Sequence, residues 1–367
     1  MATPIYLVAM TVALLTACWT LGRAAAEPTI SPRHVRLAIL AILALACLFA
    51  VGLGENGFGV LRLACYGLFG HAAIVAAYGA WLLRRKSRGW AWALAAACVA
   101  LEAVAVDAFW IEPRWLEVTH QTLASPKLSR PIRLAIVADL QTDQIGDYER
   151  GALARVMAEQ PDLILFAGDY VQEYNPRRRA ELRSQLRSLF EHLKLRAPLG
   201  AIAVGGNADL PDWEEIFVDT PIASVAETRS FDLGPLVVTA LSIRDSFRTT
   251  TRVRAREKFQ IVVGHAPNFA LGPVEGDLLV AGHTHGGQVR APWLGPLMTL
   301  SLVPRSWASG TTALEGGRTL IVSRGIGMER GFAPRLRFLC RPQLVIVDLL
   351  PLPSEDGRGE GEPLQEP

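Results

Sequence analysis

The residues best suited to chemistry lie in the segment 277–289, which reads DLLVAGHTHGGQV. The apolar run Leu278–Ala281 has the length and the bounding turn residues of a buried strand. If extended geometry continues beyond this run, His283 and His285 point the same way, because side chains two residues apart share a face. Two imidazoles beside glycines, which leave room for a ligand, indicate a metal site. The alternative is a histidine-rich surface loop.

Polar residues also follow other apolar runs in the C-terminal part of the chain. Asp139, Asp169 and Asn207 follow such runs in order, and His265 follows a later one. Side chains at the carboxyl ends of strands line the crevice in which layered α/β folds bind ligands. Core packing gives no reason for a polar residue to recur at each of these places. The sequence therefore predicts one site assembled from several strand ends.

The elements expected to position these residues are short apolar strands and two longer helices. The helix expected over 177–195 is strongly basic, and its arginines form either a solvated face, the simpler reading, or a contact with anionic lipid. The expected strands are 131–138, 162–167, 200–204, 259–263, 278–281, 319–322 and 343–349, with a hairpin within 231–243 and helices over 148–159 and 177–195.

The order of these motifs resembles the calcineurin-like metallophosphoesterase superfamily. The pattern of that family is DxH, GDxx, GNH[DE], a later His, and then GHxH. The segments GHTHGGQ and 323–327 resemble the bacterial membrane-associated branch of the superfamily. The resemblance covers 131–349 and implies a four-layer αββα sandwich with a two-metal site between the sheets. The matching residues here are Asp139 to Gln141, Gly168-Asp169, Gly206-Asn207, Gly264-His265 and Gly282 to His285.

The resemblance also implies a role for each residue. Asp169 would bridge two divalent metal ions, with Asp139 and His285 on the first ion. Mixed carboxylate, imidazole and amide ligands suit Mn, Fe or Zn more than calcium, and a weaker ligand at the first ion also admits Mg. The second ion would be bound by Asn207, His265 and His283. The expected metal ligands are Asp139, Gln141, Asp169, Asn207, His265, His283 and His285, and the expected catalytic residues are Asp169, Asn207 and His283.

The chain departs from the family pattern at two positions. Gln141 stands where DxH has its histidine, and an amide oxygen is a weaker ligand than an imidazole. Ala208 stands where GNH[DE] has its histidine, which in the family stabilises the transition state or protonates the leaving oxygen. Asp143 and Asp209 lie close to these gaps, either as auxiliary groups or as carboxylates that cap turns.

The chain has 367 residues, half of them hydrophobic, and the apolar residues are concentrated before residue 112. Residues 1–111 are expected to form about four transmembrane helices, because each apolar run approaches the ~20 residues that a bilayer requires. The first run is read as a retained helix, since no positive charge precedes it. Residues 112–130 are expected to be a linker, 131–350 the phosphoesterase domain, and 351–367 a disordered tail. The net charge of +2 gives no argument for nucleic acid.

Loop charge predicts the orientation in the membrane. The first connection carries Arg23, Arg33 and Arg36, and the third carries a basic cluster at 84–88. Basic loops stay in the cytoplasm, so an even number of spans places the C-terminal domain in the periplasm or outside the cell. The alternative, in which one run does not span, places this domain in the cytoplasm.

The sequence therefore predicts an enzyme of the inner membrane, a dinuclear-metal phosphoesterase that hydrolyses a phosphomonoester or phosphodiester. The anchor favours a lipid or cell-envelope substrate by proximity. One alternative is a degenerate domain that binds a phosphorylated ligand or metal without turnover, because Gln141 and Ala208 depart from the pattern. Another is a regulatory domain of a membrane transporter or sensor.

Overall fold

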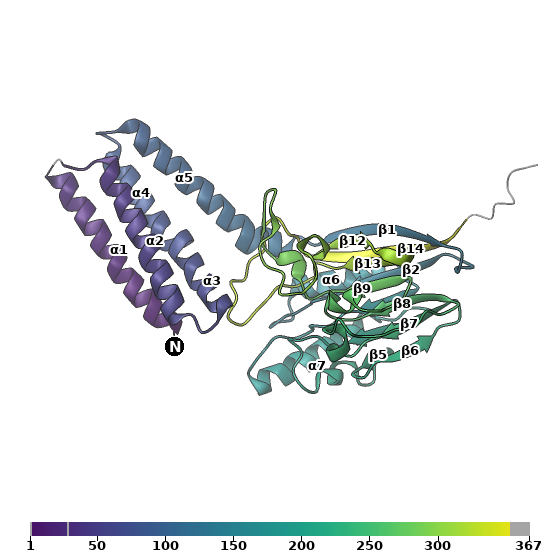
Figure 1. Ribbon diagram of the computed structural model, residues 1–367. Coiled ribbons are helices and arrows are strands. Elements are labelled where there is room, and N and C mark those ends of the chain that lie inside the picture. The colour runs from purple at the N-terminus through teal and green to yellow at the C-terminus, as the bar shows by residue number, and fades with distance from the viewer. Residues whose placement is uncertain (1, 28, 353–367) are drawn as a thin grey trace, which may run out of the picture.

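The computed structural model describes residues 2–27 and 29–352, and Figure 1 shows a helical bundle joined to a β-rich domain. Within the described residues, four helical segments are long and apolar enough to cross a membrane, which confirms the expected runs. They are α1 (Ala2–Ala26), α2 (Pro32–Leu53), the continuous α3, η1 and α4 (Gly57–Cys65, Tyr66–Ala72, Ala73–Leu83), and the continuous α5, η2 and η3 (Arg88–Val106, Asp107–Ile111, Glu112–Arg114).

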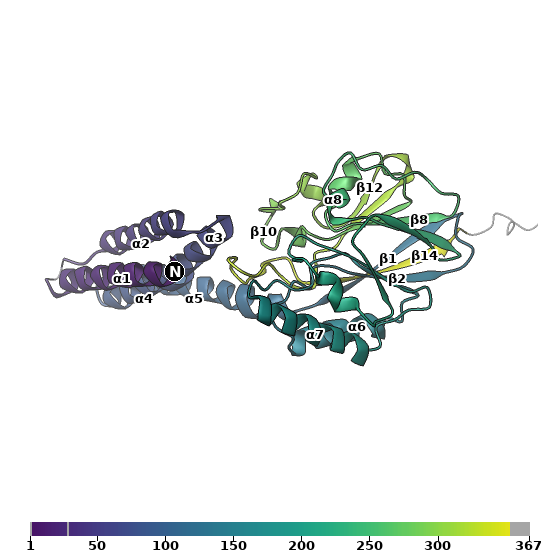
Figure 2. The same ribbon diagram turned by 90° about the horizontal axis from the view of Figure 1, so that it is seen from below.

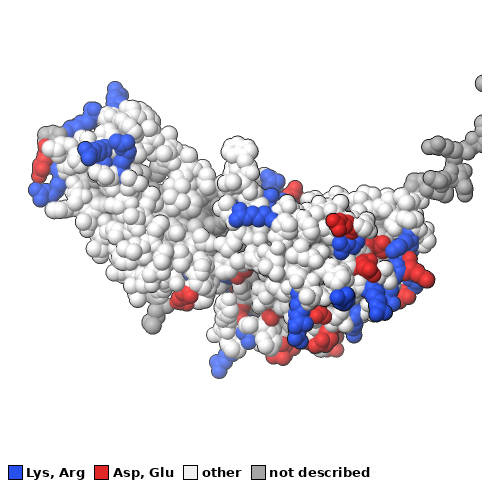
Figure 3. Space-filling model, viewed as in Figure 1, with Lys and Arg blue, Asp and Glu red and all other residues white. Residues whose placement is uncertain are grey.

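The basic connections of the bundle lie together at one end. Figure 1 places the α1–α2 and α4–α5 connections at the end of the bundle remote from the β-rich domain. Figure 3 shows Lys and Arg gathered at that end, whereas the flank of the bundle carries almost no charge. The arginine-bearing connections and the β-rich domain therefore occupy opposite ends of the helices.

The β-rich domain is built on two sheets of six strands each. In the first sheet, β2, β3, β4 and β5 are parallel, so their carboxyl ends meet at one edge. In order across it, the first sheet contains β1 (Glu117–Ser125), β14 (Gln343–Pro351), β2 (Ile132–Val137), β3 (Leu163–Phe166), β4 (Ala201–Val204) and β5 (Ile222–Val225). The second contains β12 (Gly310–Ala313), β13 (Thr319–Val322), β9 (Leu278–Ala281), β8 (Phe259–Val263), β7 (Leu236–Ala240) and β6 (Arg229–Asp232).

The core between the two sheets is formed by every second side chain of their strands. Along β2, Leu134 and Ile136 face the opposite sheet, while Ala135 and Val137 face the helices. Val238 and Ile261 meet them from the second sheet. Each inner strand is thus buried on both faces, which explains why these strands read as continuous apolar runs in the sequence.

The outer faces of the two sheets are covered differently. Helices α6 (Asp147–Ala158) and α7 (Pro176–His192) cover the first sheet (Figure 2), and α7 buries Leu186 and Phe190 there. Loops and the short helices α8 (Ile243–Ser246) and η5 (Pro267–Leu271) cover the second. The result is the expected αββα order with one thin outer layer. The remaining elements are η4 (Trp213–Phe217), η6 (His285–Gly287), β10 (Arg290–Ala291), β11 (Gly295–Pro296), η7 (Arg305–Trp307) and η8 (Glu315–Gly317).

The expected boundaries need two corrections. Residues 112–130 are not a plain linker, because they contain β1, which pairs in parallel with β14 along its whole length. This edge strand buries little and carries polar side chains, so it lacks the apolar run that marks the inner strands. At the other end, Pro351 belongs to β14 rather than to a tail. The expected disordered tail otherwise falls mostly on residues 353–367, which lie outside the described part of the chain.

Candidate metal centre

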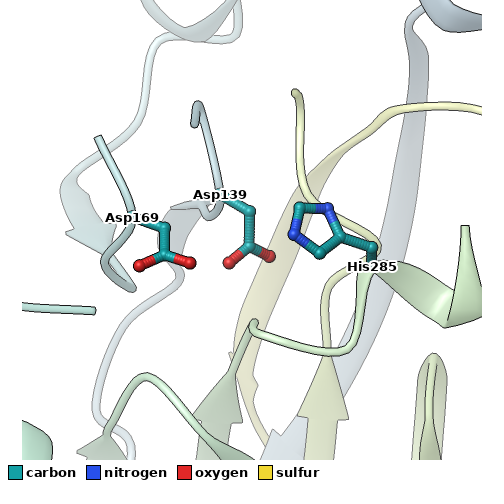
Figure 4. A group of neighbouring side chains, drawn as sticks. All are labelled: Asp139, Asp169 and His285. Atoms are coloured by element: carbon teal, nitrogen blue, oxygen red, sulfur yellow. The ribbon is translucent and has the colours of Figure 1, made fainter. Parts of the chain in front are cut away.

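The strand ends bring three of the predicted ligands into one buried group. Asp139 follows β2, Asp169 follows β3, and His285 lies beyond the end of β9. One ligand atom from each lies within 4.8 Å of the others, and all three side chains are buried. Figure 4 shows the Asp139 carboxylate between the carboxylate of Asp169 and the ring of His285. This group is a candidate metal site.

The other predicted ligands lie close to the same two aspartates. His265 is fully buried, and its Nε2 lies 3.4 Å from Asp169 Oδ2 and 2.9 Å from Asn207 Oδ1. Its Nδ1 hydrogen-bonds the carbonyl of Ala167 at 2.7 Å, which holds the ring in place. The ring of His283 stands 5.1 Å from the ring of His265, measured between centroids. His265 thus lies within 4 Å of both aspartates and of Asn207.

The hydrogen bonds of Gln141 indicate whether a cation fits this site. Its side chain is fully buried, and its Nε2 donates to Gln172 Oε1 at 3.2 Å and to Glu329 Oε2 at 2.8 Å. Its Oε1 accepts no hydrogen bond from any described residue. A buried acceptor without a donor is costly, so this oxygen needs a partner that the described residues do not supply. A divalent cation fits that need, and Gln141 comes from the same loop as Asp139.

Five of the seven predicted ligands have a strained backbone. Asp139, Gln141, Asp169, His283 and His285 all have φ between 37° and 70°. A non-glycine residue in this left-handed region costs of order 1–3 kcal/mol and persists only where the surrounding structure enforces it. The fold therefore maintains these loops in their site geometry against their local preference.

Glycines make this close approach possible. A Cβ at Gly206 would lie 2.2 Å from Asp169 Oδ1, and a Cβ at Gly282 would lie 2.8 Å from Asp139 Oδ2. Each glycine thus lets one backbone loop approach the carboxylate of another. The glycines of the predicted site therefore make room for other protein groups as well as for a ligand.

The pKa values of the site histidines move in opposite directions. Burial by itself would lower the pKa of His265, but the carboxylate of Asp169 raises that pKa to about 9. Burial lowers the pKa of His283 to about 4, and burial together with the charge of Arg337 lowers the pKa of His285 well below its usual value. Without metal, His265 is protonated at neutral pH, whereas His283 and His285 are already in the neutral form that binds metal.

The carboxylates respond to the same burial. Burial raises the pKa of Asp139 to about 7. Burial would also raise the pKa of Asp169, but the charge and hydrogen bond of His265 lower that pKa below its usual value. The metal-free site thus holds protons that a cation must displace, and metal binding releases them.

The two auxiliary candidates occupy different positions. Asp209 accepts backbone hydrogen bonds from Asp169, Tyr170 and Gly206 at 2.7–2.8 Å, so both of its oxygens hold the loops together. Asp143 forms an ion pair with Arg335 and lies 3.8 Å from Arg330. Both carboxylates position the loops of the site, as the turn-capping interpretation expects for Asp209.

The paired-histidine expectation needs a correction. Strand geometry ends at Ala281, and positive φ values at His283 and His285 turn the chain into the short helix η6. His283 consequently packs on Phe247, with 4.9 Å between ring centroids, and its Nε2 lies 3.1 Å from the carbonyl oxygen of Leu300. His285 faces the two aspartates instead. The two rings reach the site from different directions, so the local spacing alone did not determine their placement.

Sequence reasoning missed two charged residues next to the ligands. Glu329 accepts hydrogen bonds from Gln141 and Gln172, and so orients the amide of Gln141. Arg337 is fully buried, donates to the carbonyls of Arg324 and Gly327, and lies 3.4 Å from His285 Nδ1. Both residues follow the 323–327 segment already singled out, which was the available signal.

Comparisons with known proteins agree with the geometry. Residues 132–287 match the calcineurin-like phosphoesterase family. The uncharacterized metallophosphoesterase YkuE of Bacillus subtilis (strain 168) is 26% identical over 262 residues, which cover 65% of this chain and 87% of that protein. The phosphodiesterase YaeI of Escherichia coli (strain K12) is 26% identical over 255 residues, which cover 65% of this chain and 90% of that protein.

Among solved structures, the chain aligns with YfcE, a phosphoesterase from E. coli. The match covers 56% of this chain and 85% of that one, with 15% sequence identity and a TM-score of 0.27. A superposition this loose carries no argument about function.

Proposed function

The chain belongs to the calcineurin-like metallophosphoesterase superfamily, and on that premise we propose that it is a membrane-anchored phosphoesterase that uses two divalent metal ions. The observation that carries the proposal is the buried group of Asp139, Asp169 and His285, with ligand atoms within 4.8 Å of one another. The orphaned acceptor of Gln141 and the strained loops support it. The reaction is hydrolysis of a phosphomonoester or phosphodiester.

We assign the ligands to the two ions as the family pattern implies. Asp139, Gln141 and His285 would hold the first ion, and Asp169 would be shared by both. Asn207, His265 and His283 would hold the second ion. When bound, two such ions activate a water molecule and neutralise charge on the phosphoryl oxygens. Mn, Fe, Zn or Mg are the ions that this mixed set of ligands favours.

The protein residues orient the ligands and determine where protons reside. Ala208 donates its backbone N–H to Asp169 Oδ1 at 2.7 Å, so this position orients the bridging carboxylate although it lacks the family histidine. Its methyl group cannot donate a proton to a leaving oxygen. Hydrolysis by this protein should therefore depend on how readily the leaving group departs without a proton.

The placement of the domain is part of the proposal. The basic connections of the bundle lie at the end remote from the β-rich domain, and basic loops stay in the cytoplasm. We place the catalytic domain in the periplasm or outside the cell. A phosphorylated lipid or another cell-envelope phosphoester is then within its reach.

Metal analysis and a phosphoester panel test the function. We expect purified protein to contain divalent metal and to hydrolyse members of a panel of mono- and diesters. Asp169→Asn should lose bound metal and lower the rate by at least about 10³-fold, since it removes the group shared by both ions. Glu191→Gln, at an exposed position in the last turn of α7, is the matched control.

Ala208 favours a second candidate function, binding of a phosphorylated ligand without turnover. If the wild-type protein binds metal and phosphate tightly but hydrolyses no ester in the panel, the domain is a binding module without turnover. Full hydrolysis by Asp169→Asn, or by metal-free protein, contradicts the two-metal mechanism.

A further inference from the structure

A cavity of about 480 Å³ connects the candidate metal centre with the helical bundle. Asp169, Asn207 and His285 line one end of it. Leu61 of α3 and Val104 of α5 line the other end. This volume lies within the range of pockets that hold small organic ligands, roughly 300–1,000 Å³. The cavity is therefore bounded both by the candidate metal centre and by candidate membrane-spanning helices.

The walls between these two ends are apolar. Away from the metal centre, the wall residues include Phe58, Leu61, Phe69, Leu297, Leu336 and Phe338. Among the described residues that line the cavity, Asp169 and Glu329 are the only acidic ones, both lie at the metal-centre end, and none is Lys or Arg. The apolar part of these walls carries no charge to pair with a charged ligand, whereas hydrocarbon gains free energy by leaving water for it.

The cavity reaches the outer surface of the bundle. Leu61 is 41% exposed and Val104 is 37% exposed although both line the cavity. Both lie on helices that are long and apolar enough to span a membrane. A hydrocarbon chain in the surrounding bilayer therefore has an apolar path to the metal centre.

A loop of residues 292–302, here called the apolar loop, stands at the mouth of this path. Trp293 is fully exposed, and Leu294, Leu300 and Leu302 are more than half exposed. Figure 1 shows this light-green segment rising beside the domain end of α5, and Figure 3 shows an uncharged lobe there. Exposed apolar patches mark contact sites, and Trp favours membrane interfaces. Its position beside a candidate membrane span favours the bilayer as the surface that it contacts.

The apolar loop also contacts the metal centre. The carbonyl oxygen of Leu300 lies 3.1 Å from His283 Nε2, and Leu297 and Met298 line the cavity. The same segment thus covers the candidate active site on one side and presents apolar side chains outward on the other.

Polar contacts fix the domain against the bundle. Arg62 of α3 donates to the carbonyl of Gly331 at 3.1 Å, and the backbone N–H of Arg337 donates to the carbonyl of Ala108 at 2.9 Å. Glu112 accepts the backbone N–H groups of Leu339 and Cys340. The cavity is therefore a built part of the fold.

We propose that the substrate is a membrane-resident lipid phosphoester whose hydrocarbon chain enters this cavity from the bilayer beneath the apolar loop. This inference rests on the proposed function for the reaction at the metal centre. It adds a chemical class of substrate and the side chains that receive it. The phosphoryl group lies at the strand ends, and the chain lies between α3, α5 and the apolar loop.

Photo-crosslinking tests the location of the chain without turnover. The probe is phosphatidic acid with a diazirine in its acyl chain, incorporated with the full-length protein into phosphatidylcholine vesicles containing EDTA. We expect label in peptides covering 58–69, 104–108 and 297–300, and competition by unlabelled phosphatidic acid. Val104→Trp fills the cavity and should lower this labelling roughly tenfold, as expected for the loss of about two buried methylenes.

Val99→Trp is the matched control, because Val99 lies on the same helix, is 70% exposed and does not line the cavity. It should label like wild type. Leu61→Trp repeats the test from α3 if Val104→Trp does not fold. Equal labelling of the Val99 and cavity variants, or label spread evenly over the helices, overturns the inference.

Rates separate this inference from the proposed function. With metal present, the ratio of kcat/KM for phosphatidic acid to that for glycerol phosphate should fall in Val104→Trp by roughly the same tenfold factor as the labelling. An unchanged ratio together with measurable hydrolysis overturns the lipid inference and leaves the phosphoesterase standing. Specific labelling without hydrolysis of any ester supports the cavity and contradicts the phosphoesterase.

Discussion

The metal-centre edge and the membrane-facing side of this protein are built in contrasting ways. At the edge, Asp139 and Asp169 follow strands and adopt a strained backbone, and a glycine of another loop packs against each carboxylate. On the membrane side, the cavity is lined by ordinary apolar residues such as Leu61 and Val104, in relaxed helices. Chemistry thus depends on individual residues, whereas recognition of a hydrocarbon chain depends on shape and on apolar area.

The largest effect concerns the orientation of the membrane side. A reporter fused after Arg130 should be active if it works only outside the cytoplasm and silent if it works only inside, because the basic connections remain in the cytoplasm. A second fusion in the α4–α5 connection should give the opposite result. Reversed activities would place the catalytic domain in the cytoplasm and would restrict the substrate to the inner leaflet.

The next largest effect tests whether catalysis at the metal-centre edge depends on a single residue, the one at position 208. General-acid help is typically worth ~10²–10⁴-fold and matters most for poor leaving groups. Ala208→His should therefore raise the rate on alkyl phosphoesters by up to about 10²-fold, and much less on nitrophenyl esters. The measurement is a rate series across leaving groups for both proteins, with Ala208→Gln as the control.

A flat dependence on leaving group in the unmodified protein would contradict this account of Ala208. Another residue would then already serve as the acid. Glu329 would be the first to replace, because it lines the cavity, whereas Asp209 uses its oxygens on three backbone amides.

The pH dependence of metal binding is a smaller effect at the same edge. His265 has a pKa of about 9 in the metal-free protein, and metal must displace its proton. Metal affinity should rise with pH up to about 9, by at most about tenfold per pH unit for one released proton. Calorimetric titration with Mn²⁺ in buffers of different ionisation enthalpy measures both the affinity and the protons released. An affinity independent of pH between 7 and 9 contradicts the protonated state of His265.

The same pKa gives the sign of a stability change. A raised histidine pKa contributes stability that is complete below its usual value of about 6.5 and is lost as the pH rises through about 9. The Tm in EDTA should therefore fall between pH 7 and 9, and bound metal should remove this fall. His120→Asn, which replaces a half-exposed histidine in β1, should leave the fall in place.

The smallest effect tests the membrane side again. Trp293 is fully exposed, so Trp293→Ser removes apolar area without disturbing the core. We expect a fewfold lower ratio of lipid to water-soluble phosphoester hydrolysis, since one interfacial side chain of several is lost. Trp92→Ser, on α5 near the remote end of the bundle, is the matched control. Equal ratios in both variants would show that the apolar loop does not contact the bilayer.

The chemistry could be predicted from the sequence because its signals are local. Apolar runs that end in Asp139, Asp169 or His265 identify a strand and the residue after it, and the order of the motifs identifies the fold. The four apolar helices were equally visible, since length and composition suffice to recognise a span. The hairpin of β6 and β7, with its turn at Gly234, was also predicted, because turn residues precede the apolar run of β7.

Only the tertiary structure decided the features that depend on distant partners. Strand β1 exists through its pairing with β14 at the far end of the chain, so its own polar sequence reads as a linker. The positive φ values of His283 and His285 are enforced by surrounding loops, which local spacing does not record. The cavity joins residues 58–108 of the bundle to residues 287–338 of the domain. The sequence does not show which apolar residues line the same cavity. That depends on how the domain packs against the helices.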